Sequence, residues 1–337
     1  MNIPFIWLAE PAHAAIGISL LFALISLLTI LLLYLRRRSA EDEIVQDKKA
    51  DSRLSKELMV RLEMGHYQQA INSKELEPQQ VERVFSHLLQ LVRGPERDLL
   101  LVIADAMAVP DFAIAKLRHR SGARRIDALR MLEQFPVPRV VQLISACMAT
   151  DRSTMVRTEA AAILTRIGAV PSPAAIIDAL NLQTTNPSPL HAAMFRAGSV
   201  QHSAEMATLV QELPTGALRS MVAEALGWSE DFSMLSILAD LAQSDDFELR
   251  IAGLKAARQL GHPGARTWVV PMLLDPVDAV RVQAVRACGQ LGLVEAIPLL
   301  SRLVENSSWW VRTRAAESLA ILRAGQPAPF AVTGLRK

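Results

Sequence analysis

A unit of about 31 residues recurs along most of this chain, and no other feature limits its fold so strongly. In three copies near the C-terminus, ELRIAGLKAARQLG, AVRVQAVRACGQLG and WVRTRAAESLAILR, an apolar residue precedes an arginine. The recurring arginines are Arg125, Arg157, Arg219, Arg250, Arg281 and Arg312, separated by 31 or 32 residues except for one double step of 62. Within that double step, the copy in between has Leu190 and His191 at the positions of the apolar residue and the arginine. This predicts one irregular copy with a longer, proline-containing loop.

The residues within each copy predict two helices joined by a turn. An apolar residue stands seven positions after the arginine, at Leu132, Leu164, Leu226, Ala257, Cys288 and Leu319, and we expect it to be buried. A glycine follows eleven after the arginine at Gly168, Gly261 and Gly292, where a helix C-terminus favours the left-handed conformation. A second apolar stretch comes next, such as VVQLISACM or EAIPLLSRLV. The unit is therefore helix, turn, helix.

One such helix pair is too small to bury its apolar faces alone, so successive pairs must stack on each other. This predicts an all-α fold, an α-solenoid or superhelix of helix-turn-helix repeats over residues 121–325. Residues 54–120 have helical periodicity with weak repeat signatures, which fits either divergent repeats or an N-terminal cap. Residues 326–337 form a C-terminal tail with two prolines, which either packs over the last repeat or frays.

The repeat resembles a known family. The pattern D-x-x-V-R-x-x-A-x-x-x-L-x-x-L-G-x-x-E-A-I-P-x-L describes the short bacterial HEAT-like repeats of phycobilin lyases, and DAVRVQAVRACGQLGLVEAIPLL at 278–300 is similar to it. The resemblance implies a HEAT-type solenoid. It also leaves open a chromophore-lyase-like enzyme subunit as an alternative function.

Residues 14–35 form a stretch of 22 residues without a charge, which as a helix would be roughly 33 Å long. Arg36, Arg37 and Arg38 follow, while residues 1–13 contain no Lys or Arg. This predicts a single transmembrane helix in the cell (inner) membrane, with 1–13 outside, 36–53 as a charged juxtamembrane linker and the solenoid in the cytoplasm. Small residues at Ala15, Ser19 and Ala23 lie on one stripe of that helix and are candidates for contact with another membrane helix.

No motif for catalysis, a cofactor or a metal is present. Seven histidines are scattered without a ligand spacing, and Cys147 and Cys288 have no metal or redox motif. The deoxyhypusine hydroxylases built from HEAT repeats carry His-Glu dipeptides as iron ligands, and this sequence has none. We therefore predict that the chain is not an enzyme and takes no small-molecule substrate.

The repeated arginine is predicted to be structural, bonded to an adjacent turn or carboxylate. Asp151, Asp246 and Asp278 precede three of these arginines and are the expected helix caps and ion partners.

Two groups of residues are candidates for binding a partner. The first is a basic cluster at one junction between repeats; the second is a pair of tryptophans at a helix start. The candidates are Arg118, Arg120, Arg124, Arg125, Arg130, Trp309 and Trp310. For the arginines the alternative is an ordinary solvated turn, and for the tryptophans it is a cap formed by the C-terminal tail.

The sequence thus favours a membrane-anchored scaffold or adaptor, in contact with the bilayer through residues 14–35, that binds a protein partner on its solenoid. A membrane-associated enzyme of envelope or polysaccharide biosynthesis is the partner we expect. A nucleic-acid-binding role through Arg118–Arg130 is a further alternative, although the net charge of only +2 makes it the weaker one.

Overall fold

The computed structural model describes residues 21, 24–31, 49–60 and 77–325 of the chain. These residues form helices and turns, and no strand occurs among them. The chain divides into two compact units, residues 1–115 and 116–337. The prediction of an all-α chain is confirmed.

The first unit is a small helical bundle. It contains the helical residues 49–60, α2 (Pro78–Leu91), α3 (Pro95–Ala106) and α4 (Val109–Lys116), the last of which ends just beyond the boundary. Leu58, Phe85 and Leu100 are fully buried in its core. Arg83 pairs with Asp51 at 3.2 Å on its surface.

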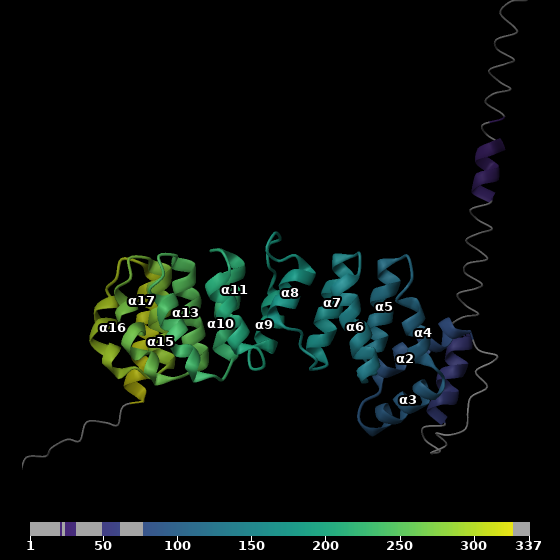
Figure 1. Ribbon diagram of the computed structural model, residues 1–337, viewed down its shortest axis with the longest axis horizontal. Helices are drawn as coiled ribbons and strands as arrows, with labels where there is room; N and C mark the ends of the chain where they lie inside the picture. The colour runs from purple at the N-terminus through teal and green to yellow at the C-terminus, as the bar shows by residue number, and fades with distance from the viewer. Residues whose placement is uncertain (1–20, 22–23, 32–48, 61–76, 326–337) are drawn as a thin grey trace, which may run out of the picture. The chain divides into compact units, whose positions relative to one another are not determined.

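The second unit is a row of helix pairs, in which each helix lies antiparallel to the one before it (Figure 1). The pairs pack on their neighbours in chain order, with α5 against α7, α11 against α13, and α15 against α17. This is a helical solenoid, as the repeat predicts. Its helices are α5 (Gly122–Leu132), α6 (Pro138–Thr150), α7 (Thr154–Arg166), α8 (Pro173–Leu180), α9 (Pro189–Gly198), α10 (Ser203–Glu212), α11 (Ala217–Ala225), α12 (Leu235–Ala242), α13 (Phe247–Leu260), α14 (Arg266–Val269), α15 (Asp278–Gln290), α16 (Ile297–Leu303) and α17 (Trp309–Ala324).

The buried positions follow the repeat. The residue seven after each repeated arginine is no more than 5% exposed in every copy, which confirms it as the recurring core position. Gly168, Gly261 and Gly292 have φ values of +79°, +74° and +67°, the left-handed conformation that was expected at the end of the first helix. The helix-turn-helix unit is therefore confirmed.

Two glycines allow neighbouring first helices to approach closely. A Cβ atom on Gly227 would lie 2.7 Å from the Cα and carbonyl oxygen of Ala256, and one on Gly289 would lie 2.7 Å from Ser318 Oγ. At the second contact the Ser318 hydroxyl also donates a buried hydrogen bond of 2.9 Å to the Val285 carbonyl. Small residues at these points bring backbone against backbone, which tightens the stack.

Two copies depart from the regular unit. Between α8 and α9 the chain forms the longer loop that the frame shift predicts, and Asn181 adopts a left-handed conformation at its start. In residues 263–274 the second helix is broken into the short helix α14 and two 3₁₀ turns, because Pro271 cannot continue the helical hydrogen bonding.

The predicted membrane location is wrong. Among the residues that the structure describes, no helix is both long and apolar enough to cross a membrane. Of the predicted span, residues 21 and 24–31 are described and are helical. The rest of the span, with Ala15, Ser19 and Ala23, lies outside the described residues, as do residues 1–13 and the tail 326–337.

Candidate functional site

The repeated arginine clamps the loop that leads into its own helix. In five copies its Nη1 donates to the backbone carbonyl six residues earlier, at 2.7 or 2.8 Å. The pairs are Arg125 with His119, Arg157 with Asp151, Arg250 with Ser244, Arg281 with Asp275 and Arg312 with Asn306. The predicted structural role of this arginine is confirmed for these copies.

The residue six before the arginine also uses its side chain. It accepts a hydrogen bond from the backbone N–H two residues later and so orders the turn before the helix. His119 accepts from Ser121 (2.9 Å), Asp151 from Ser153 (2.8 Å), Ser244 from Asp246 (3.2 Å), Asp275 from Val277 (2.8 Å) and Asn306 from Ser308 (2.9 Å).

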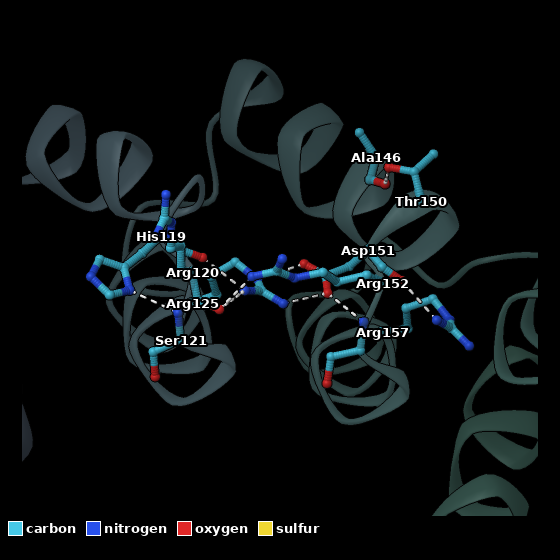
Figure 2. A network of polar contacts seen from close by, with 10 residues as sticks. His119, Arg120, Ser121, Arg125, Ala146, Thr150, Asp151, Arg152 and Arg157 are labelled. Atoms are coloured by element: carbon cyan, nitrogen blue, oxygen red, sulfur yellow. Dashed lines mark hydrogen bonds and ion pairs between the residues drawn. The ribbon is translucent and has the colours of Figure 1, made fainter.

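Where this residue is an aspartate, it also joins two repeats. Arg125 forms a two-point ion pair with Asp151, with both N–O distances 2.8 Å, and the two side chains are 5% and 9% exposed (Figure 2). Arg250 pairs with Asp275 in the same way, at 2.8 and 3.1 Å. Burial opposes ionisation of Asp151, but hydrogen bonds from Arg125 and the Ser153 amide outweigh it and hold the pKa of this carboxyl below its ordinary value.

The three predicted aspartate partners behave differently. Asp151 caps the turn before α7 and is an ion partner. Its partner, however, is Arg125, 26 residues before it, rather than Arg157. Asp278 pairs with Arg281, and Asp246 caps α13 by accepting from the Glu248 amide at 2.9 Å. Asp275 was missed, although it occupies the same repeat position as Asp151 and could have been found by aligning the copies.

Two arginines of the predicted basic cluster are paired with carboxylates, and the other three are exposed. Arg125 is 4% exposed and belongs to the internal ion pair, and Arg130 pairs with Glu159 at 3.0 Å. Arg118, Arg120 and Arg124 are exposed.

Exposed Arg152 was not predicted. It reaches the Arg120 carbonyl from the next repeat and adds a fourth charge to this junction (Figure 2). The sequence signal that could have identified Arg152 is its place in the next copy, in the loop that corresponds to the loop of Arg120. We call Arg118, Arg120, Arg124 and Arg152 the basic junction.

Trp309 and Trp310 lie on the first turn of α17. Their rings meet edge to face, with centroids 4.6 Å apart, and the residues are 56% and 60% exposed. Arg312 holds the preceding loop through the carbonyls of Asn306 and Ser307, at 2.7 and 2.8 Å. The pair is therefore presented on a fixed turn.

A groove of about 380 Å³ crosses the first helices α9, α11 and α13. Phe247 stands at its edge, 44% exposed. Glu224 in its wall pairs with Arg196 at 3.0 Å and Lys255 at 2.9 Å, so these three side chains together leave one net positive charge at this point. Sequence reasoning missed this groove because its residues come from three copies.

Neither a metal site nor a reactive thiol appears in the described part of the chain. No group of three or more His, Cys, Asp or Glu residues there could hold a metal ion. Cys147 and Cys288 are free thiols, and burial raises the pKa of Cys288 to about 12, which keeps it protonated and unreactive.

Comparison with known proteins identifies the repeat. Residues 271–336, which include α15, α16 and α17, match the family of HEAT repeats. The last repeats of the solenoid are therefore HEAT repeats. No curated protein matches this chain.

Several solved structures are similar to this chain at low identity. YibA of Escherichia coli is 18% identical, with a TM-score of 0.41 over 77% of this chain and 96% of that one. An engineered protein is 17% identical, with a TM-score of 0.35 over 73% and 79%. Human deoxyhypusine hydroxylase is 15% identical, with a TM-score of 0.33 over 79% and 98%. None of these similarities bears on what this chain binds or does.

Proposed function

We propose that this protein is a scaffold that binds a protein partner along the edge formed by the loops before its first helices. The observation that carries the proposal is the exposed pair Trp309 and Trp310. Tryptophan is among the residues most enriched at the energetic centres of interfaces, and exposing two of them in contact leaves a large apolar area in water.

The supporting argument is that the loop under this pair is already ordered. Because Arg312 fixes the loop in the free protein, a partner would not have to order it on binding, which lowers the entropic cost of association. The same clamp recurs along the unit, so the edge offers several fixed loops with different side chains. That combination suits the recognition of an extended protein surface.

The kind of partner stays a prediction. A membrane-associated enzyme of envelope or polysaccharide biosynthesis is the partner expected from the sequence. A chromophore-lyase-like activity has no specific support in the described residues, and the prediction that the chain is not an enzyme is untested.

Affinity capture with the tagged full-length chain tests the proposal. The double variant W309A/W310A should lose a co-purifying protein that the unaltered chain retains. The matched control is F232A/V294A, which removes two apolar side chains that are 55% and 45% exposed elsewhere on the same unit. Equal recovery of partners by all three proteins would contradict a role for the tryptophan pair.

A further inference from the structure

The basic junction carries positive charge that the protein does not neutralise. Residues 116–166 contain ten Lys and Arg residues but only four acids, Asp127, Glu133, Asp151 and Glu159. Asp151 is taken by Arg125, while Glu133 and Glu159 are engaged by Arg166 and Arg130. Among the described residues, no carboxylate lies within ion-pair distance of Arg118, Arg120, Arg124 or Arg152.

Two hydrogen-bond donors also face each other at this junction. His119 Nδ1 accepts the Ser121 amide hydrogen at 2.9 Å, which requires the neutral imidazole with its hydrogen on Nε2. Nε2 lies 3.0 Å from Nη1 of Arg124, which is always a donor. Neither group satisfies the other, but an anionic oxygen beside them would accept from both.

The backbone at this point is held in place. The carbonyl oxygens of His119 and Arg120 accept from Arg125 at 2.8 and 3.2 Å, and Arg152 donates to the Arg120 carbonyl as well. Figure 2 shows these bonds converging on the loop from two helix pairs. An anion would therefore meet donors whose backbone is already ordered, which favours binding.

From these contacts we infer that the basic junction, with His119, is a carboxylate-binding site for an acidic peptide segment of a partner protein. Arginine forks bind carboxylates through two parallel hydrogen bonds, and several adjacent acidic side chains would engage several of the four guanidinium groups at once. The inference deepens the proposed function and rests on it, because it names the chemistry of the partner.

A nucleic acid suits this surface less well. Non-specific binding of single strands uses a continuous basic groove with aromatic side chains on which bases stack. The only aromatic residue of 116–166 other than His119 is Phe135, which is 8% exposed and so unavailable for stacking. Beyond the junction, Arg130 and Arg166 are paired with glutamates, so the positive surface is short.

The test is the binding of a short fluorescein-labelled polyglutamate peptide to the full-length chain, followed by fluorescence anisotropy at low salt. The variant R118Q/R120Q/R124Q should weaken binding about tenfold or more. The control R286Q/R302Q/R323Q removes the same charge from three exposed arginines elsewhere, and should change the affinity by less than about twofold. Equal weakening by both variants would overturn the inference, because only net charge would then matter.

His119→Asn separates the ligand role from folding. Asn306 fills the equivalent position naturally and accepts from the Ser308 amide at 2.9 Å, so asparagine should preserve the turn while removing the Nε2 donor. We expect normal thermal unfolding and several-fold weaker peptide binding. Unchanged binding would overturn the role assigned to this donor pair.

Competition distinguishes other anions. If oligothymidylate binds more tightly than the peptide and shows the same loss in R118Q/R120Q/R124Q, the site is for nucleic acid and the inference fails. If inorganic phosphate displaces the peptide completely at low concentration, the site is for a small anion and the inference fails too. Because Trp309 and Trp310 lie in another repeat, W309A/W310A should bind polyglutamate normally, so failure of this inference and failure of the proposed function give different results.

Discussion

At the scale of the residue, Asp151 performs three tasks that hold two repeats together. Its carboxylate pairs with Arg125, it accepts from the Ser153 amide, and its backbone carbonyl accepts from Arg157. Removing the side chain by Asp151→Ala leaves the buried Arg125 charge without its partner. We expect a loss of about 3 kcal/mol in the free energy of unfolding, measured by urea titration with circular dichroism.

Asp246→Ala is the matched control for this change. Asp246 also caps a helix through the amide two residues later, but no arginine side chain is paired with it. Loss of a cap alone should cost about 1 kcal/mol. Equal effects of the two substitutions would show that the Arg125 ion pair adds no stability.

The same carboxylate predicts a pH dependence. Because the pKa of Asp151 is lower in the folded protein than the ordinary value of 3.8, its contribution is fully present above that value. It is lost as the pH falls through the folded pKa. The difference in unfolding free energy between the unaltered chain and Asp151→Asn should therefore be constant near neutral pH and shrink only in acid. A difference that shrank between pH 8 and pH 6 would contradict this assignment.

At the scale of the element, the close approach of α13 to the 3₁₀ turn that follows α11 depends on Gly227. An alanine there would place its Cβ 2.7 Å from the Ala256 backbone, which cannot move aside as a flexible side chain could. We expect Gly227→Ala to lower the midpoint of thermal unfolding, with a cost of about 1–3 kcal/mol. Gly122→Ala is the control, since its Cβ would meet nothing closer than 3.7 Å and should be tolerated.

The helices themselves could be predicted from the sequence because each copy repeats the same local pattern. Leu132, Leu164 and Leu226 mark one buried face, and Gly168 marks the following turn. The links between copies could not be read in the same way. The partner of Arg125 stands 26 residues away, and only the packing of two repeats brings it within 2.8 Å.

The candidate site was predictable only in part, for the same reason. A run of arginines at 118–130 was visible, but the sequence does not say that Arg125 is buried against Asp151 while Arg124 stays exposed. The membrane prediction failed differently. It rested on the length and hydrophobicity of residues 14–35 and on the arginines that follow them, but among the described residues no helix is both long and apolar enough to cross a membrane.

At the scale of the whole molecule, the two-point pairing of the repeated arginine with an aspartate of the next copy occurs at Arg125 and at Arg250 but not in the copies between them. Arg157 bonds to the Ala179 carbonyl instead of a carboxylate, and Arg219 donates to the Val210 carbonyl instead of the loop six residues before it. The helix α9 also packs less closely on α7 and α11 than α15 packs on α17. In a repeat array each unit is stabilised mainly by its neighbours, so this stretch should open first.

Hydrogen exchange measured by mass spectrometry tests that order of opening. Backbone amides of α9 and α10 should exchange faster than those of α13 and α15, which are joined by the Arg250–Asp275 pair. Asp275→Ala should then raise exchange in α13 and α15 toward the rate of α9, while α5 and α7 keep their protection because their own pair is intact. If all first helices exchanged at one rate and responded together to Asp275→Ala, the unit would unfold as a single cooperative block. The missing arginine–aspartate pairs would then have no bearing on where it opens.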